Sequence, residues 1–370
     1  MKRQLLGVAA ILLSISTYAQ DNPLWMRYCA ISPDGTTIAF TYKGDIYTVP
    51  STGGRASQIT TNPAHDTKPI WSPDGKKIAF ASDRMGSMDI FEVNKEGGIP
   101  KRLTTHSGNE TPVAYKDAGH ILFLANIMPT VEDAQFPSGQ FQQVYEVNTE
   151  GGRPALFSSM PMEDISINHT GNTLLYHDKK GYEDPWRKHH TSSITRDIWL
   201  CSLNGNRTFR KQTTFNGEDR TPVWASDDKS FYYLSEEKGS FNIFKRDIDG
   251  NTSKQITNHT KHPVRFLSAA SNGTLCYGYD GEIYTVKEGA IPQKVQISIV
   301  TDKNDKDLIR QIKRSGATEI SLSPDAKEIA FVLRGDVYVT STEYSTTKQI
   351  TNTPQQERDI HFSPDGRSIV

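Results

Sequence analysis

Four side chains able to carry positive charge follow one another at Arg187, Lys188, His189 and His190, inside a long polar stretch without a strand pattern. Arginine can hold a carboxylate with two parallel hydrogen bonds, so this group is a possible anchor for the carboxyl end of a peptide. A solvated charged loop, or a contact surface for other domains, explains the same residues. Consecutive histidines in a loop do not face one metal ion, and no HExxH or CxxC pattern is present, so no metal site is predicted.

Three acidic residues share one position, five residues ahead of an aromatic side chain that precedes a turn: Asp66 before Trp71, Glu110 before Tyr115 and Asp219 before Trp224. If the segments that carry them form a circle, these acids could ring the mouth of a central channel. Acidic side chains near turns also bind backbone N–H groups, which is the commoner role. Both interpretations depend on the elements that hold these residues.

No pattern typical of an active site or a cofactor site stands in the chain. A Gly-x-Ser-x-Gly elbow, a Walker loop and a GxGxxG motif between a strand and a helix are missing, so neither catalytic residues nor a cofactor are predicted. Cys29, Cys201 and Cys276 each lie in an apolar run and are predicted to be small buried core residues, because disulfides do not organise a fold of this kind.

The positioning elements are indicated by a repeated phrase, an apolar residue followed by Ser-Pro-Asp-Gly and a short strand. Its clearest copies start at Ile31, Trp71, Leu322 and Phe362, and weaker copies start at Tyr115, Ile167, Trp224 and Ala269. Proline sets φ for the first turn position, aspartate bonds its own backbone and glycine adopts the left-handed conformation. Each copy therefore predicts a hairpin turn.

Two further phrases recur in each unit. One is a polar residue followed by a β-branched and an aromatic residue, as at residues 45–47, and the other is a triplet ending in Ile-Thr or Leu-Thr, as at residues 58–60. Each unit supplies four short antiparallel strands, and about 40 residues separate clear successive turns, which is typical of a propeller blade. The predicted fold class is all-β: a six-bladed β-propeller followed by the truncated start of a second propeller.

The repeats divide the chain into four segments. Residues 1–19 are predicted to be a signal peptide, 21–297 a six-bladed β-propeller, 298–316 a charged connector and 317–370 the incomplete first blades of a second β-propeller. A single seven-bladed ring with an attached fragment is the alternative that irregular repeat spacing leaves open. Each blade is expected to complete its own four strands, so that the ring closes through side chains without a borrowed strand.

The amino-terminal residues predict export. Positive charges at Lys2 and Arg3 precede the apolar run from Leu5 to Ile15, and small residues up to Ala19 suit a signal peptidase. The run is too short for a stable membrane span, so we expect a periplasmic protein without a membrane span once the signal is removed. The formal net charge of -1 argues against nucleic-acid binding.

These phrases are similar to the propeller repeat shared by the Tol-system periplasmic protein, the dipeptidyl and prolyl peptidases, and the tricorn peptidases. The tandem arrangement behind a signal peptide, and the insertion from Tyr182 to Ser193, resemble the amino-terminal propeller region of exported bacterial tricorn-type peptidases. The resemblance covers nearly the whole mature chain.

The resemblance implies the non-catalytic propeller region of a serine peptidase. In that family a six-bladed propeller precedes a seven-bladed one, a mixed region, a PDZ domain and the peptidase core, and a homo-oligomer is expected for the full-length protein. The propellers would guide or dock oligopeptides for the downstream active site, and no catalytic residue can be carried over to this chain. The alternative is a stand-alone periplasmic binding or scaffold propeller similar to the Tol-system protein.

Overall fold

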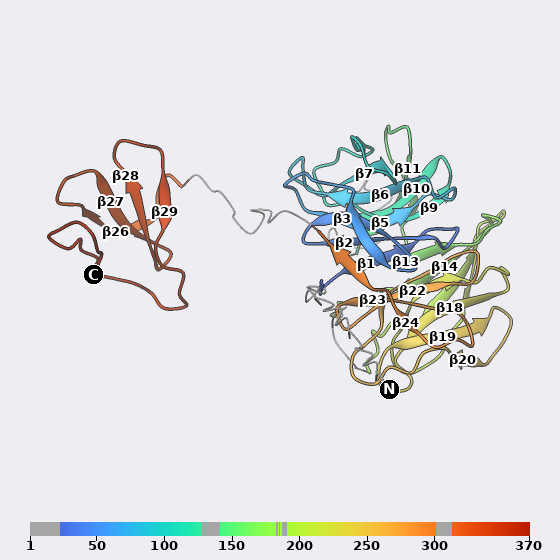
Figure 1. Ribbon diagram of the computed structural model, residues 1–370. Coiled ribbons are helices and arrows are strands. Elements are labelled where there is room, and N and C mark those ends of the chain that lie inside the picture. Colours follow the sequence, from blue (N-terminus) through green and yellow to red (C-terminus); the bar gives the residue numbers. More distant parts are fainter. Residues whose placement is uncertain (1–22, 128–140, 183, 185, 187–190, 301–312) are drawn as a thin grey trace, which may run out of the picture. The chain divides into compact units, whose positions relative to one another are not determined.

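The computed structural model describes residues 23–127, 141–182, 184, 186, 191–300 and 313–370 (Figure 1). The chain divides into two compact units, Met1–Asp302 and Lys303–Val370. The described residues form strands and turns, and no helix among them is long and apolar enough to cross a membrane. The predicted signal peptide lies outside the described residues, so export stays a prediction.

The described part of the first unit contains six sheets with four sequential strands each, which we number blades 1 to 6 in chain order. The blades comprise β1 (Arg27–Ile31), β2 (Thr37–Tyr42), β3 (Asp45–Pro50) and β4 (Gly54–Gln58); β5 (Asp66–Trp71), β6 (Lys77–Ser82), β7 (Asp89–Asn94) and β8 (Lys101–Arg102); β9 (Thr111–Asp117), β10 (His120–Ala125), β11 (Gln143–Asn148) and β12 (Ala155–Ser158); β13 (Met162–Ile167), β14 (Thr173–Asp178), β15 (Ile198–Ser202) and β16 (Thr208–Lys211); β17 (Asp219–Trp224), β18 (Ser230–Ser235), β19 (Asn242–Asp247) and β20 (Ser253–Gln255); and β21 (Arg265–Ala269), β22 (Leu275–Tyr279), β23 (Glu282–Val286) and β24 (Gln293–Lys294).

The first strands of the six blades form a closed ring. β1 contacts β5, and the contacts continue through β9, β13, β17 and β21 back to β1. In Figure 1 the colours of the blades run round the ring from blue through yellow to orange. The all-β propeller fold is thereby confirmed.

Hydrogen bonds explain the residue types of the turn phrase. In blade 2, Ser72 Oγ donates to Asp74 Oδ1 at 2.7 Å and accepts from Lys77 N at 3.0 Å. Asp74 Oδ1 also accepts from Lys76 N at 3.1 Å, and Gly75 has a φ of 67° that favours glycine. The turn is therefore closed by its own side chains before any contact with another blade is made.

The threonine of the closing phrase has a structural role in each blade that carries it. Thr60 Oγ1 accepts a hydrogen bond of 3.0 Å from Ile46 N, and Thr104 Oγ1 accepts one of 2.9 Å from Ile90 N. Because the acceptor follows the fourth strand and the donor lies on the third, the bond joins the outer strands after their ladder ends. A buried N–H group is thereby satisfied.

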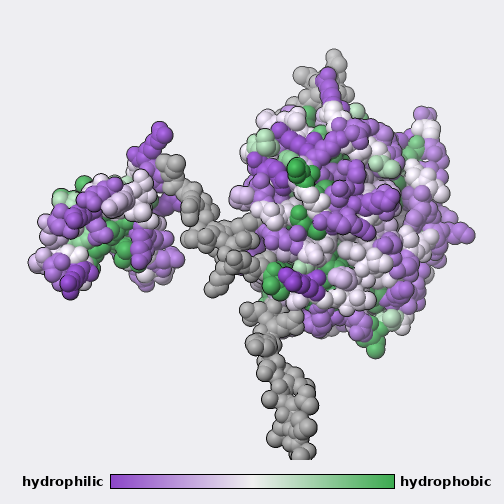
Figure 2. Space-filling view, turned by 45° about the horizontal axis from the view of Figure 1, so that its top comes forward, coloured by the Kyte–Doolittle hydropathy of each residue, from purple (hydrophilic) through white to green (hydrophobic). Residues whose placement is uncertain are grey.

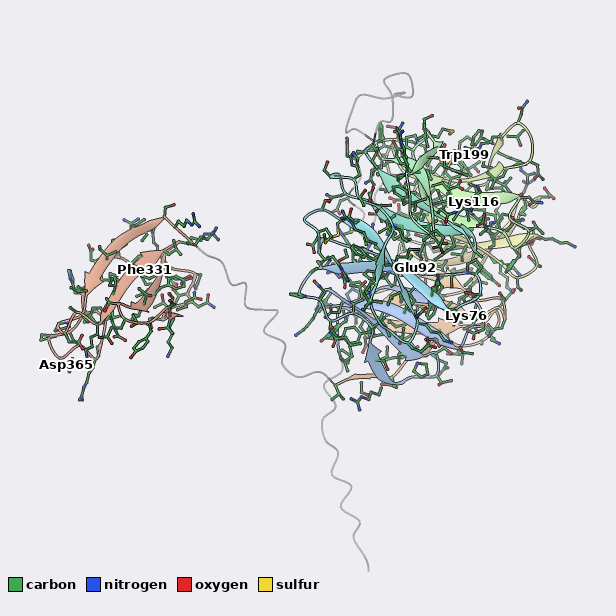
Figure 3. The ribbon with its side chains drawn as sticks, turned by 90° about the horizontal axis from the view of Figure 1, so that it is seen from above. Lys76, Glu92, Lys116, Trp199, Phe331 and Asp365 are labelled. Atoms are coloured by element: carbon green, nitrogen blue, oxygen red, sulfur yellow. The ribbon has the colours of Figure 1, made fainter. Side chains whose placement is uncertain are left out.

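Neighbouring blades are joined by buried polar contacts as well as apolar ones. Glu92 in β7, labelled in Figure 3, accepts a hydrogen bond of 2.9 Å from the Tyr115 hydroxyl of blade 3 and one of 2.7 Å from Lys77 Nζ of its own blade. Glu92 is 5% exposed, so the pairing satisfies a carboxylate inside the interface.

The contact between blades 1 and 6 differs from the prediction. After β24 the chain forms β25 (Ile297–Ile299), which pairs in parallel with β4 as a fifth strand of blade 1. Gly54 N also donates to the Gln296 carbonyl at 2.8 Å. The expectation that no strand is borrowed is therefore wrong, and the connector predicted from residue 298 begins inside this strand. The repeat phrases could not reveal β25 because its partner lies at the other end of the propeller sequence.

The second unit contains one sheet of β26 (Ala317–Leu322), β27 (Glu328–Leu333), β28 (Asp336–Ser341) and β29 (Thr347–Gln349). Phe331, labelled in Figure 3, stacks on Tyr338 with the ring centroids 5.6 Å apart. Leu322 is 57% exposed, whereas Ile31, its counterpart in blade 1, is 4% exposed. Figure 2 shows hydrophobic side chains of this unit between hydrophilic ones. A single blade can bury its apolar face only against neighbouring blades, which explains why Leu322 is exposed. The second propeller stays a prediction.

Candidate functional site

The candidate site is the central channel of the first unit. A cavity of about 520 Å³ is lined by residues of β1, β5, β9, β13, β17 and β21. Six lining residues occupy one place in the repeat, three residues before the apolar residue that precedes the turn: Tyr28, Lys68, Pro112, Asp164, Thr221 and Phe266. We call these six residues the channel ring. They differ in size, charge and polarity although the strands that carry them repeat.

A bulge in the inner strand presents five of these side chains. The pairing of β1, β5, β13, β17 and β21 with the next strand is irregular at these positions. The backbone there is left-handed, with φ of 52° at Tyr28, 53° at Lys68, 49° at Asp164, 51° at Thr221 and 58° at Phe266. This conformation costs a residue with a β-carbon about 1 kcal/mol or more, and bulges re-aim side chains. In five blades, therefore, the residue that faces the channel has a strained backbone conformation.

Basic side chains outnumber acidic ones in the channel wall. The wall contains Lys68, Lys179, Arg196, Arg220 and Arg265 against Glu163 and Asp164. Burial opposes ionisation of Glu163, but hydrogen bonds from His177 at 3.2 Å and Lys179 at 2.6 Å hold the pKa of that carboxyl below its usual range. Burial lowers the pKa of Arg220 to about 10, which leaves its guanidinium charged at neutral pH. Lys179 pairs with Glu163, and Arg196 and Arg220 pair with the buried Glu218, so the wall keeps a smaller excess of positive charge that favours anionic groups.

Aromatic side chains line the part of the channel formed by blades 6 and 1. The rings of Tyr28 and Phe266 are 4.8 Å apart, and Lys68 Nζ lies 5.7 Å from the centre of the Tyr28 ring. Trp186, from the connection between β14 and β15, lies 6.0 Å from the Phe266 ring, and its carbonyl accepts a hydrogen bond of 2.6 Å from Arg265. Blade 4 thus contributes an aromatic side chain to the opposite part of the channel. Rings and cations together can hold an apolar group beside a carboxylate.

The serine hydroxyl groups of the channel wall are held by backbone amides. Ser166 Oγ accepts a hydrogen bond of 3.3 Å from Trp224 N, and Ser268 Oγ accepts one of 3.0 Å from Ile31 N. The His177 ring contacts carboxylates, and neither serine is bonded to it. A nucleophile bonded to its base is the arrangement that acyl transfer requires.

Comparison with known proteins agrees with this architecture. Residues 23–290 match the family described as the tricorn protease N-terminal beta propeller domain. The chain belongs to this family. The chain is 25% identical over 339 residues to tricorn protease homolog 1 of Streptomyces coelicolor, covering 90% of this chain and 30% of that protein. It is 25% identical over 334 residues to the tricorn protease of Thermoplasma acidophilum, covering 85% of this chain and 29% of that protein.

The crystal structure of the tricorn protease has the same fold. Its TM-score is 0.65 at 19% sequence identity, with 92% of this chain and 33% of that chain covered. The resemblance to the amino-terminal region of tricorn-type peptidases is therefore confirmed. This chain spans about 30% of the length of the curated relatives that it matches.

The blade 4 insertion of this chain occupies residues 179–197, between β14 and β15. His177, just ahead of this insertion, belongs to β14 and lines the channel. The predicted carboxylate anchor at residues 187–190, formed by Arg187, Lys188, His189 and His190, lies outside the described residues and stays a prediction. Trp186, directly before it, is described and contacts blade 6.

The predicted acidic ring is not at the channel. Asp66 and Glu110 are 0% exposed and Asp219 is 1% exposed, and none of the three lines the cavity. Arg84 Nη2 lies 2.9 Å from both carboxylate oxygens of Asp66. The channel-mouth interpretation is therefore wrong, because these three carboxyl groups are buried away from the cavity.

The channel ring was missed although the sequence contains a signal for it. Positions that build the scaffold repeat their residue type, as the Ser-Pro-Asp-Gly turns do. The position three residues before the apolar residue has a fixed place but a different residue type in each blade. A variable position inside a repeated phrase indicates a side chain that faces a ligand or solvent.

Two of the buried acids should make folding depend on pH. Burial raises the pKa of Glu110 to about 7 and that of Asp219 to about 7, although Thr104 and Ser235 act in the opposite direction. Unfolded carboxyl groups lose their protons near pH 4, so between about pH 4 and 7 the folded state binds more protons. The contribution of these two groups to the free energy of unfolding therefore falls as pH rises through this range. The wild type loses unfolding free energy between pH 4 and pH 8, and this loss should be smaller by on the order of 2 kcal/mol in Glu110→Gln and in Asp219→Asn.

Urea denaturation at pH 4 and pH 8 measures this difference. Glu96→Gln is the control, because the Glu96 side chain is 73% exposed and its replacement should leave the pH dependence as in the wild type. If both amide variants lose as much stability between the two pH values as the wild type does, the buried carboxyl groups are not its source.

Proposed function

We propose that this chain is the non-catalytic propeller region of an exported tricorn-type serine peptidase, and that its first propeller binds oligopeptides in the central channel and guides them. The observation that carries the proposal is the channel ring. Five blades hold left-handed, non-glycine residues at one position, and these unlike side chains surround one cavity. Strained backbone that is repeated around a cavity supports a binding role for that cavity.

The composition of the channel wall supports peptides with a free carboxyl end. Lys68 and Arg265 offer cationic groups to a carboxylate, and Tyr28, Phe266 and Trp186 offer aromatic surface to an apolar side chain. Charge-assisted hydrogen bonds are about twice as strong as neutral ones. Peptides whose carboxyl end is amidated should therefore bind less well than the free acids.

The proposal extends to the parent protein. The relatives are named proteases, and this chain spans about 30% of their length. We expect a PDZ domain and a serine peptidase core in the parent, with a homo-oligomeric assembly in the periplasm. The propeller itself supplies no catalytic residue in this scheme.

Lys68→Glu tests the binding role of the channel. The substitution reverses one charge in the wall, so peptides with a free carboxyl end should bind about 10-fold more weakly, because a charge-assisted contact is replaced by repulsion. Fluorescence anisotropy of oligopeptides labelled at the amino end measures this affinity on the chain itself. The amidated peptides should lose much less.

Lys76→Glu is the matched control. Lys76, labelled in Figure 3, has a side chain that is 77% exposed, and it does not line the cavity. Its reversal should change the affinity less than two-fold, as expected for a screened surface charge. Equal losses in the two variants, or equal affinity for free and amidated peptides in the wild type, would reject the channel as the binding site.

A further inference from the structure

Two cysteine side chains from opposite ends of the propeller sequence meet at the contact between blades 1 and 6. Cys29 lies in β1 and Cys276 in β22, and both belong to one apolar core, with exposures of 4% and 0%. Strands β1 and β22 pack against each other, and the Cys29 thiol adds to burial in raising the pKa of the Cys276 thiol, so the two side chains are neighbours. Ser268 Oγ lies 3.5 Å from the carbonyl oxygens of both cysteines, so their backbones also approach the same point.

This contact is the one place in the first unit where adjacent blades are not consecutive in the chain. Blades 1 and 6 are held by backbone bonds, among them Ser271 N to the Pro33 carbonyl at 2.9 Å and Met26 N to the Gly281 carbonyl at 3.1 Å, and by β25. Every other pair of adjacent blades is also tied by the chain that runs between them. A covalent bond here would close the ring permanently.

We propose that Cys29 and Cys276 form a disulfide that locks the propeller ring shut under oxidising conditions. The two thiols lose two protons and two electrons as the S–S bond forms, and a disulfide-bearing oxidant, such as oxidised glutathione, accepts the electrons and becomes two thiols. The enclosed loop joins the first strand to the last blade. Cross-links over long loops remove the most freedom from the unfolded chain.

Burial determines when the bond forms. Desolvation raises the pKa of the Cys276 thiol well above its usual value, and the thiolate is the species that attacks a disulfide. Thiol–disulfide exchange is therefore slow in the closed ring and fast while the chain folds or while blades 1 and 6 are apart. Compartments in which exported proteins fold supply oxidants for this step.

Thiol counting on the whole 370-residue chain tests the lock. The protein is refolded in oxidised or in reduced glutathione, denatured and alkylated. We expect one free thiol, Cys201, after oxidation and three after reduction, with a cross-linked peptide containing Cys29 and Cys276 in the digest. The oxidised form should melt about 5 to 10 °C higher than the reduced form. Incubation of the already folded, reduced protein should produce the bond much more slowly than refolding does.

The variants separate the lock from other effects of oxidation. Cys201→Ser is the matched control, since Cys201 lies in blade 4 and should leave both the bond and the melting difference unchanged. Cys29→Ser and Cys276→Ser should each abolish the melting difference between oxidised and reduced samples. If these variants do not fold, the wild-type thiol count and peptide map still decide. Three free thiols after oxidative refolding, or a cross-link that contains Cys201, would overturn the proposal.

Discussion

Replacing Ile297 by aspartate should lower the free energy of unfolding of the first unit by about 3 to 5 kcal/mol. Ile297 lies in β25, is 4% exposed and packs in the core that blades 1 and 6 share. An uncompensated charge in this core is strongly unfavourable, and displacement of β25 would also remove its parallel pairing with Gly54. Urea denaturation followed by circular dichroism measures the loss.

Ile99→Asp is the control for this substitution. Ile99 is 98% exposed, so the same change of residue type should alter the stability by no more than about 0.5 kcal/mol. Hydrogen exchange in Ile297→Asp should accelerate in β1 and β22, which meet at the contact between blades 1 and 6, and stay slow in β10 of blade 3. A loss as small as that of the control would show that β25 does not hold the ring closed.

Removing Arg84 should have an effect of similar size. Its guanidinium carries the only charge paired with Asp66 among the described ion pairs, and Asp66 is fully buried. The guanidinium also lies 4.5 Å from the centre of the Phe91 ring of the same blade, which holds it beside Asp66. Arg84→Ala leaves a buried carboxylate without its partner, so we expect a loss of about 3 to 5 kcal/mol in the same urea experiment.

A double variant distinguishes the charge from the packing. Asp66→Asn combined with Arg84→Met removes both charges of this ion pair, so the double variant should recover most of the stability lost in Arg84→Ala. Lys101→Ala is the control: it breaks an ion pair with Glu150 at 2.8 Å that is exposed, and it should leave the denaturation midpoint nearly unchanged. Equal destabilisation in the single and double variants would place the effect in the lost packing instead.

The all-β propeller could be predicted because each blade encodes its own turns and strands. The Ser72 and Asp74 side chains close their turn within a few residues, and Thr60 reaches Ile46 within one blade. Such local contacts leave a phrase that can be read without knowing what surrounds it. The same phrases, with the insertion in blade 4, were enough to indicate the tricorn family.

The candidate site could be predicted only in part. Asp66 and Lys68 are two residues apart in one strand, so a regular strand would point both side chains to the same side. Asp66 is instead buried away from the cavity, whereas Lys68 lines it. The bulge between Thr67 and Ile70 causes this difference, because it adds a residue to the strand and turns the side chains that follow. Alternation along a regular strand cannot predict such a change, so the acidic position was placed at the channel and the channel ring was missed.

The amino-acid sequence by itself determined the blades, their order and the family, because turn chemistry acts over a few residues. Only the tertiary structure decided how the ring is closed and what faces the channel. β25 pairs with β4, and Cys29 lies beside Cys276, because six consecutive blades bring the two ends of the first unit together. Contacts between distant segments arise from the summed geometry of all the blades, and no local phrase records that sum.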